Sequence, residues 1–238
     1  MKRVISVMML VMVICSAKSQ NVVYDANAEV RKVAAFTGID VSGSVLLYIS
    51  QGTETGVAVS ADEEKYNSKI KTEVKNGILH ISVDGGMWNG FSLTNKKLKA
   101  YVSVIQLQQL HVSGASNVVF TGKIQGDDLN MTVLGASEIK GALQLKNLII
   151  SISGASVVRL TGSADNANIN ASGAARINAL DLQVETGKFD ISQASHITIS
   201  VSKELNANAS GGSTIQYRGD AMAKSVNVNG GATIKKKS

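Results

Sequence analysis

The stretch ISISGASVV at residues 150–158 decides the fold of this chain. Aliphatic and polar residues alternate on both sides of Gly154, and a period of two residues is typical of β-strands. Close variants of this stretch occur seven times between Val112 and Ile234, at intervals of 18 to 21 residues. A unit this short cannot enclose a core alone, so the repeat predicts a solenoid of stacked coils. The copies centre on Gly114, Gly135, Gly154, Gly173, Gln193, Gly211 and Gly230.

Three positions of the repeat are apolar in every copy: four residues before the centre, two residues before it and four residues after it. In the copy around Gly154 these positions are Ile150, Ile152 and Val158. Because they share one face of their strands, we expect them to line the core. Each copy is predicted to be two short strands that meet at a tight bend, followed by a looser return such as residues 121–123.

Small residues follow the centre of every copy, as in Gly154-Ala155-Ser156. Glycine permits the positive φ of a tight corner, and small side chains let neighbouring coils approach to about 4.8 Å. A Gly-x-Ser motif is also typical of the nucleophile elbow of hydrolases. Seven aligned copies favour a structural corner over a catalytic serine. Gln193 replaces glycine in one copy, which predicts an altered or bulged corner there.

Residues 30–104 are predicted to be less regular β-structure that caps the N-terminal end of the solenoid. Residues 39–47 repeat the strand-Gly-strand pattern as an upstream eighth copy. Asn76-Gly77, between two alternating segments, is a strong signal for a β-hairpin. The sequence therefore predicts an all-β fold. It is a parallel β-helix-like solenoid with coils of about 19–20 residues over residues 105–238 and an irregular N-terminal β cap.

The N-terminus has the order of a secretory signal peptide. Residues 1–3 read Met-Lys-Arg, and an apolar run over residues 4–15 precedes small residues that end at Ser19. A basic start, a short apolar stretch and a small-residue cleavage site are typical of such a leader. We expect residues 1–19 to be removed. Residues 20–238 then form one β-solenoid domain that is periplasmic, on the outer surface or secreted.

Cys15 is the only cysteine, and it offers an alternative to a cleaved, unlipidated protein. Lipid attachment through Cys15 is disfavoured because Ile14 stands where a lipobox has a small residue. A membrane-spanning helix is disfavoured as well, since the apolar run is shorter than about 20 residues. Without Cys15 the mature chain has no disulfide, so a packed core must stabilise it.

The charge of the chain argues against nucleic acid as a partner. The formal net charge of +6 falls to +3 when Lys2, Arg3 and Lys18 leave with the leader. The remaining basic residues are scattered, apart from those around residue 97 and in the tail over residues 235–237. Binding of nucleic acid needs a concentrated basic stripe.

The sequence predicts no catalytic residue, cofactor or metal ligand. Carbohydrate-cleaving β-helices need carboxylates that converge across neighbouring coils, and the acids here do not share a strand column. Several acids lie in the return turns, where an acidic corner that holds a cation is the alternative: Asp127, Asp165, Glu185 and Glu204. The three histidines lie on separate segments without a metal-ligand spacing: His80, His111 and His196.

The best candidate for a binding surface is the loop over residues 85–95, which holds the single tryptophan. Met87, Trp88 and Phe91 lie among glycines there, and residues of these kinds often anchor interfaces. The alternative is a hydrophobic cap in which the loop folds over the first coil. In the first case Trp88→Ala weakens adhesion at an unchanged melting temperature. In the second case it costs about 3–5 kcal/mol of stability.

Several of these motifs together resemble a known family. They are FTGIDVSG at residues 36–43, the hairpin over residues 71–81, YVSV at residues 101–104 and LHVSGAS at residues 110–116. In this combination the chain resembles the bacterial auto-transporter adhesin, head GIN domain, family over nearly all of its mature length. The resemblance implies a parallel β-helix-like fold on secreted or envelope proteins, and it carries over no catalytic motif.

We therefore expect a non-catalytic secreted or cell-envelope protein that acts in adhesion or surface recognition. Its partner is expected to be a protein or glycan on a surface, without nucleic acid and without a membrane span. The alternative is a glycan-binding or glycan-active β-helix. The aromatic content of 4% disfavours that alternative, because sugar sites usually contain aromatic stacking surfaces.

Overall fold

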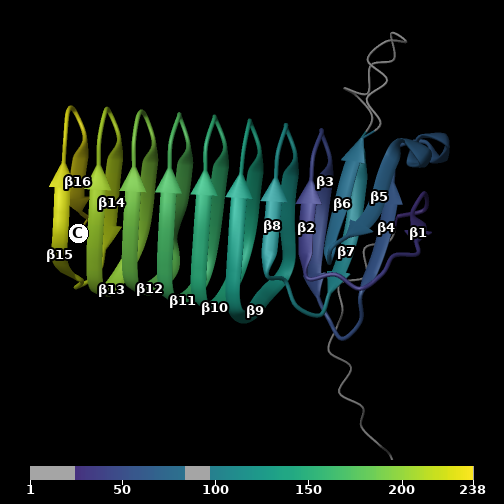
Figure 1. The fold of residues 1–238 in the computed structure, drawn as a ribbon, viewed down its shortest axis with the longest axis horizontal. Helices are drawn as coiled ribbons and strands as arrows, with labels where there is room; N and C mark the ends of the chain where they lie inside the picture. The colour runs from purple at the N-terminus through teal and green to yellow at the C-terminus, as the bar shows by residue number, and fades with distance from the viewer. Residues whose placement is uncertain (1–24, 84–96, 238) are drawn as a thin grey trace, which may run out of the picture.

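The computed structural model describes residues 25–83 and 97–237, which form a β-solenoid of about seven turns. Figure 1 shows the coils stacked along the long axis, with the N-terminal elements at one end and the last coils at the other. The all-β, β-helix-like fold predicted from the repeat is thereby confirmed. Each regular coil contributes strand segments to two sides of the solenoid, and tight corners join the two sides along one edge.

The regular coils consist of long strands that pair in parallel. The strands are β8 (Gln109–Val112), β9 (Asn117–Val133), β10 (Glu138–Ile152), β11 (Val157–Ala171), β12 (Arg176–Ile191), β13 (His196–Ala209), β14 (Thr214–Arg218), β15 (Met222–Val228) and β16 (Thr233–Lys236). Equivalent positions of the repeat lie opposite each other: Ile139 pairs with Val158, and Ile150 pairs with Ile169. One sequence interval therefore equals one turn of the solenoid.

The return path of each coil differs from the sequence prediction. The expected looser return at residues 121–123 lies inside β9. Strands β9 to β13 are 14 to 17 residues long because parallel pairing continues around the return. Short shifts of register interrupt this pairing, for example between Arg159 and Gly162. Each return meets an equivalent return on the next coil, so its backbone groups find partners there.

The corners stack directly on one another, as the glycine column predicts. Gly135 has a φ of +77°, and the amide of Ala136 donates a hydrogen bond to the carbonyl oxygen of Gly114 at 2.9 Å. A Cβ atom on Gly135 would lie 2.5 Å from that same oxygen. Glycine is needed at this corner for the left-handed backbone and for the close approach of the coils.

Gln193 keeps the same corner without glycine. Its φ is +62°, and the amide of Gly212 donates to its carbonyl oxygen at 2.7 Å, as at the other corners. The predicted altered or bulged corner at Gln193 is therefore wrong. The side-chain Oε1 of Gln193 accepts a hydrogen bond from the amide of Gly173 at 2.5 Å. This bond offsets part of the cost of a left-handed backbone at a residue with a Cβ atom.

The apolar columns of the repeat form one continuous core between the sides of the solenoid. Ile152, for example, is 3% exposed. All three columns are buried in every coil from the copy around Gly43 to the copy around Gly211. Stacked aliphatic side chains thus exclude water along the whole axis. The last coil is the exception, because its Val226 and Val228 are exposed.

The upstream eighth copy stacks directly on the first regular coil. It is formed by β2 (Gly38–Val41) and β3 (Leu46–Gln51). β2 pairs with β8, so that Ile39 lies opposite Leu110, and β3 pairs with β9. The elements between residues 52 and 104 are therefore an insertion that folds beyond this copy.

The insertion and the first strand of the described chain form the predicted N-terminal cap. Its elements are β1 (Glu29–Arg31), β4 (Gly56–Ser60), the 3-10 helix η1 (Glu64–Lys69), β5 (Ile70–Lys75), β6 (Ile78–Val83) and β7 (Lys99–Val104). β6 and β7 run parallel to β2 and β3 and add one coil. β5 pairs antiparallel with β6, as the hairpin signal predicts, and β4 pairs antiparallel with β7. These antiparallel strands end the parallel ladder. Across the described ranges, no helix is long and apolar enough to cross a membrane.

Candidate functional site

The predicted recognition loop falls outside the described residues. Met87, Trp88 and Phe91 all belong to residues 84–96, so their role stays a prediction. The described chain shows where this segment is attached. β6 ends at Val83, whose side chain lies beside the corner at Gly43, and a Cβ atom on that glycine would be 3.1 Å from Val83 Cγ2. Val83, the last described residue before this segment, therefore lies at the level of the corners.

The serine column of the corners is buried and hydrogen-bonded. The hydroxyl of Ser137 donates to the carbonyl oxygen of Leu134 at 2.9 Å, and the hydroxyl of Ser213 donates to that of Ser210 at 2.8 Å. A nucleophilic serine needs an accessible hydroxyl beside a general base. These serines instead satisfy the carbonyl groups of their own corners, which is the structural role that the repeat predicts.

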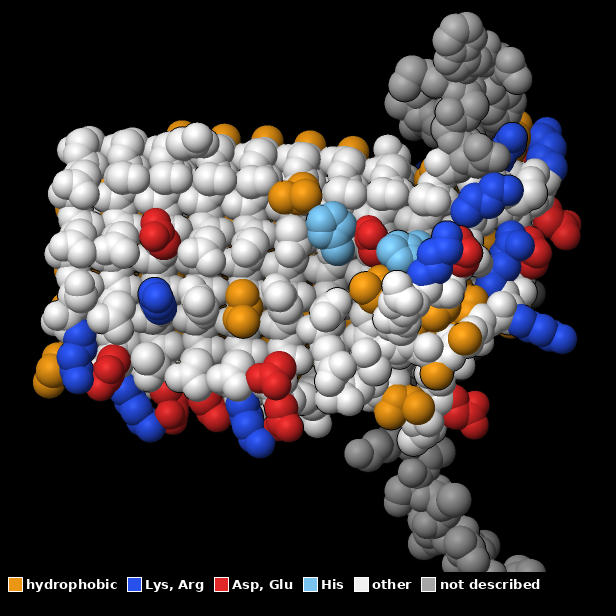
Figure 2. Space-filling model, in the orientation of Figure 1, with side chains coloured by type: hydrophobic (Ala, Val, Ile, Leu, Met, Phe, Trp, Pro, Cys, Tyr) orange, Lys and Arg blue, Asp and Glu red, His pale blue; other side chains and the backbone are white. Residues whose placement is uncertain are grey.

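Acidic residues of the return turns pair with lysines of the next coil. Asp127 pairs with Lys146 at 2.8 Å, and Glu185 pairs with Lys203 at 2.6 Å. The hydrogen bonds to these carboxylates raise the pKa of Lys146 and of Lys203. Figure 2 shows acidic and basic side chains close together along the lower edge of the regular coils. Over residues 25–83 and 97–237, no group of three or more His, Cys, Asp or Glu side chains is arranged to hold a metal ion.

Two of the histidines lie in one row, although the sequence places them far apart. Asp40 on β2 stands between His80 on β6 and His111 on β8, and Figure 2 shows such a row of His, acidic and His side chains. Nδ1 of His80 is 3.2 Å from Oδ2 of Asp40. Asp40 and His111 both occupy the third position before a corner glycine. The sequence pattern alone therefore indicates that these two residues are neighbours on adjacent coils. His196 lies on β13, where burial and the charge of Arg176 lower its pKa.

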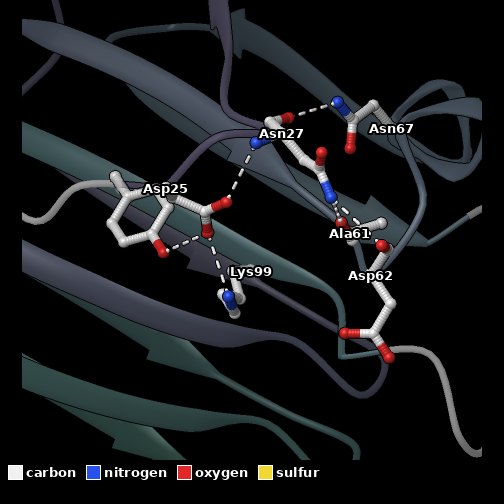
Figure 3. A network of polar contacts seen from close by, with 7 residues as sticks. Asp25, Asn27, Ala61, Asp62, Asn67 and Lys99 are labelled. Atoms are coloured by element: carbon white, nitrogen blue, oxygen red, sulfur yellow. Dashed lines mark hydrogen bonds and ion pairs between the residues drawn. The ribbon is translucent and has the colours of Figure 1, made fainter.

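A polar cluster fastens the start of the described chain to the cap (Figure 3). Asp25 accepts hydrogen bonds from Nζ of Lys99 at 2.9 Å and from the hydroxyl of Tyr101 at 2.7 Å. These two bonds hold the pKa of Asp25 well below its usual range. Burial and the bond to Asp25 raise the pKa of Tyr101. Asn67 Nδ2 donates to the carbonyl oxygen of Asn27 at 2.8 Å. These bonds tie the start of the described chain to the cap, which is a structural role, although Oδ1 of Asn67 is buried without a hydrogen-bond partner.

Outward-facing residues form a straight row on one side of the solenoid. This side is made by the strand segments that come directly after the corners in the sequence. Its central members, from Tyr48 to Thr198, all stand five residues after a corner position. Its first members come from the cap. Strand pairing therefore brings together residues that the repeat pattern alone does not connect. This row, here named the outer row, consists of Val30, Ala58, Tyr101, Tyr48, Val119, Lys140, Arg159, Asn178 and Thr198.

A groove along the outer row has a volume of about 810 Å³ and spans β9 to β13. The buried side chains of Phe120 and Leu160 line it, together with the exposed Lys140 and Arg159. Gly141 keeps it open, because a Cβ atom there would lie 2.5 Å from Phe120. The groove thus combines an apolar lining with hydrogen-bond donors, which suits an extended ligand better than a reaction centre.

A second groove of about 370 Å³ lies beside two stacked tyrosines of the outer row. The ring centroids of Tyr48 and Tyr101 are 5.2 Å apart, with an angle of 9° between the rings. Their other neighbours in the row are small: Ala58 follows Tyr101, and Val119 follows Tyr48. The pair therefore offers an apolar platform with polar hydroxyl tips. Sequence reasoning missed this platform because only the pairing of β3 with β7 brings the tyrosines together.

Over its described residues the chain is a β-solenoid with open grooves along the outer row. The chain belongs to the family described as "Putative auto-transporter adhesin, head GIN domain", which it matches over residues 35–221. This match confirms the resemblance carried by the corner, strand and hairpin motifs. A comparison with curated proteins gives no match.

Several solved structures are similar to this chain. A putative adhesin from Bacteroides fragilis has a TM-score of 0.81 at 23% identity, with 88% of this chain and 96% of that chain covered. A putative lipid binding protein from Parabacteroides distasonis has a TM-score of 0.68 at 22% identity, with 90% and 98% covered. A putative adhesin from Parabacteroides merdae has a TM-score of 0.64 at 18% identity, with 89% and 95% covered. Identities this low show a shared fold.

Proposed function

We propose that this chain is a non-catalytic protein of the cell envelope or the cell exterior that recognises surface ligands in adhesion. Its family and the adhesins among its structural neighbours support this role. The observation that carries the proposal is the outer row with its two grooves. Parallel strands hold the members of the row from Tyr48 to Thr198 on both sides, so a ligand meets a surface that is already ordered. Pre-organised surfaces of this kind lower the entropic cost of binding.

The N-terminal sequence supports export of the protein. We propose that residues 1–19 act as a signal peptide and that the mature chain starts near Gln20 without a lipid. Mass spectrometry of the native protein tests this. A mature N-terminus near Gln20 is expected, whereas retention of residues 1–10 or a diacylglycerol on Cys15 contradicts the proposal.

A glycan is the ligand that the tyrosine platform favours. The half-buried rings of Tyr48 and Tyr101 can pack against the apolar face of a sugar ring, while the hydroxyl of Tyr101 stays hydrogen-bonded to Asp25. Further along the outer row, Lys140 and the guanidinium of Arg159, one nitrogen of which is paired with Glu138, offer hydrogen-bond donors for hydroxyl or carboxylate oxygens. A chain of sugars lying along the solenoid axis would meet the aromatic groups and the donors in succession.

A glycan array and a polysaccharide-hydrolysis screen on the mature protein test both parts of the proposal. Tyr48→Thr and Arg159→Gln are each expected to weaken binding about tenfold, as truncation of an interface anchor does. Lys188→Gln is the matched control, because Lys188 is exposed on the strand that precedes its corner, away from the outer row. Its binding is expected to equal that of the unmodified protein.

Three results would change this assignment. Binding that both outer-row variants leave intact would overturn the outer row as the contact surface. Loss of binding in Trp88→Ala at an unchanged melting temperature would assign the contact to the loop over residues 85–95. Robust cleavage of a polysaccharide, abolished by a single change of an Asp or Glu, would show that the protein is an enzyme.

A further inference from the structure

The two sides of the regular coils differ in charge. The eight residues that follow each corner from Gly114 to Gly211 include four basic and two acidic side chains. The five residues that precede each of the same corners include one of each, Lys188 and Asp190. Figure 2 shows this second side, on which few charged side chains lie above the lower edge of the regular coils. The charged residues of the first side are Lys140, Arg159, Arg176 and Arg218, with Glu138 and Asp181.

Strand pairing places like charges side by side on the first side. Lys140 on β10 lies opposite Arg159 on β11. On the next coil, Arg176 on β12 lies opposite His196 on β13, and the charge of Arg176 lowers the pKa of that histidine. Like charges on directly opposed residues of neighbouring strands destabilise a sheet. The arrangement therefore has a cost in folding that alternating charges would avoid.

Two of these bases lack an acidic partner. Among the residues that the structure describes, neither Lys140 nor Arg176 forms an ion pair, and both side chains are exposed. The lysines of the return turns differ, since Lys146 and Lys203 each pair with a carboxylate of the preceding coil. Exposed bases without a partner are available to an anionic ligand.

The bases line two grooves that meet. Lys140, Arg159 and Asn178 line the groove of about 810 Å³ along the outer row. Asn178 also lines a groove of about 350 Å³, together with Arg176 and His196. Because Asn178 belongs to both grooves, these five residues form one continuous surface, here named the basic groove. Its bases stand on the successive coils of β10, β11 and β12, one base on each coil.

We propose that the glycan recognised by this protein is an acidic polysaccharide, whose carboxylates bind Lys140, Arg159 and Arg176 in the basic groove. This inference rests on the proposed function, since it names the class of glycan. The polymer lies along the solenoid axis, with its sugar rings over the apolar lining of Phe120 and Leu160. A carboxylate on each sugar unit then meets bases that follow one another at about 4.8 Å, the spacing of paired strands.

The density of charge favours a polysaccharide over nucleic acid. Duplex DNA carries one negative charge per about 1.7 Å of its axis. The three bases of the basic groove extend over two intervals between coils, which is roughly 10 Å. Most phosphates of a duplex beside them would therefore find no partner. A polymer of acidic sugars has fewer charges for its length, and its apolar ring faces suit the lining of the groove.

Glu138 competes with such a ligand for Arg159. One carboxylate oxygen of Glu138 pairs with Nη1 of Arg159, and both side chains are partly exposed. Asp181, the other acid of this side, lies 4.0 Å from Nη2 of Arg218. Removal of the charge of Glu138 leaves Arg159 free for the ligand. Glu138→Gln is therefore expected to bind an acidic polysaccharide about two- to fivefold more tightly than the unmodified protein.

Titration calorimetry with polygalacturonate and with alginate, each compared with its methyl ester, tests the proposal. The ester keeps the sugar backbone and removes the charge. The acidic polymers are expected to bind more tightly than their esters, and added salt is expected to weaken their binding. The double variant Lys140→Gln and Arg176→Gln is expected to weaken this binding at least about tenfold, while binding of the esters stays the same. Lys188→Gln, an exposed lysine of the other side, is the matched control.

The melting temperature of the double variant is expected to stay the same, because neither side chain has an ion pair to lose. Equal binding of the acidic polymers and their esters would overturn the acidic class of ligand, and so would intact binding in the double variant. In both cases the proposed function stands if Tyr48→Thr weakens binding of the ester. Failure of every polysaccharide to bind would overturn both proposals. Tighter binding of a single-stranded oligonucleotide, lost in the double variant, would assign the basic groove to nucleic acid instead.

Discussion

The stacked corners provide a direct test of the solenoid at Gly135. Replacement by alanine adds one methyl group at a residue with φ +77°, and its Cβ would lie 2.5 Å from the carbonyl oxygen of Gly114. Gly77 in the cap hairpin is a matched control. It has nearly the same φ, +75°, but no atom lies within 4 Å of the position of its Cβ. The two variants therefore share the backbone cost and differ in crowding between coils.

The expected magnitudes follow from these two contributions. A left-handed backbone at a non-glycine residue costs about 1–2 kcal/mol, and Gly77→Ala is expected to lose about this much stability. Gly135→Ala also forces a methyl group against a backbone oxygen that the amide of Ala136 already holds at 2.9 Å. Overpacking of this kind typically costs a further amount of about 1–3 kcal/mol. The free energy of unfolding of Gly135→Ala is therefore expected to fall by roughly 2–5 kcal/mol.

Urea denaturation followed by circular dichroism measures both variants. The midpoint and the m-value are compared, because separation of one coil from its neighbours exposes surface in the folded state and lowers the m-value. Gly135→Ala is expected to unfold at a clearly lower urea concentration than Gly77→Ala. Equal losses in the two variants would refute the argument that glycine allows the coils to approach.

Three further predictions test separate parts of the structure. Ile152→Asp is expected to cost about 3–5 kcal/mol because it buries an unpaired charge, whereas Asn170→Asp on an outward column is expected to change stability by less than about 0.5 kcal/mol. Equal shifts of melting temperature would refute the strand register. Because the pKa of Asp25 is lowered in the folded protein, this group stabilises the fold at a pH above its unfolded pKa of about 3.9. This stability is lost as the pH falls towards the folded pKa. Asp25→Asn is therefore expected to be less stable than the unmodified protein at neutral pH, and thermal melts should show this gap narrowing below about pH 4; a gap that stays constant contradicts the role of the pair with Lys99. Gln193→Gly is expected to be more stable than Gln193→Ala by about 1 kcal/mol, since both lose the side-chain bond and alanine alone keeps the left-handed cost. The reverse order in thermal melts would exclude backbone strain at this corner.

The solenoid and the register of its coils could be predicted from the sequence because equivalent residues of successive copies are neighbours. Ile152 and Ile177 are buried, as the column pattern predicts. The position of the upstream copy was also predictable, since Gly43 opens the same corner as the later glycines. The return at residues 121–123 was predicted wrongly because its pairing comes from the adjacent coil, and no local pattern of alternation marks it.

The proposed binding surface depends on contacts that the repeat does not encode. Tyr48 belongs to the repeat and Tyr101 to the cap insertion, and they stack only because β7 pairs with β3. His80 reaches Asp40 in the same way, through the pairing of β6 with β2. The insertion has its own hairpins, and the periodic pattern does not specify which strand of the cap lies beside which coil.

The sequence by itself determined that Val226 and Val228 belong to the core columns, since they occupy the same positions as residues that are buried in every other coil. Only the tertiary structure decided that both are exposed. The sequence pattern specifies which face of a strand points inward. Burial also requires a neighbouring coil on each side, and in the described chain the last coil has a neighbour on one side alone.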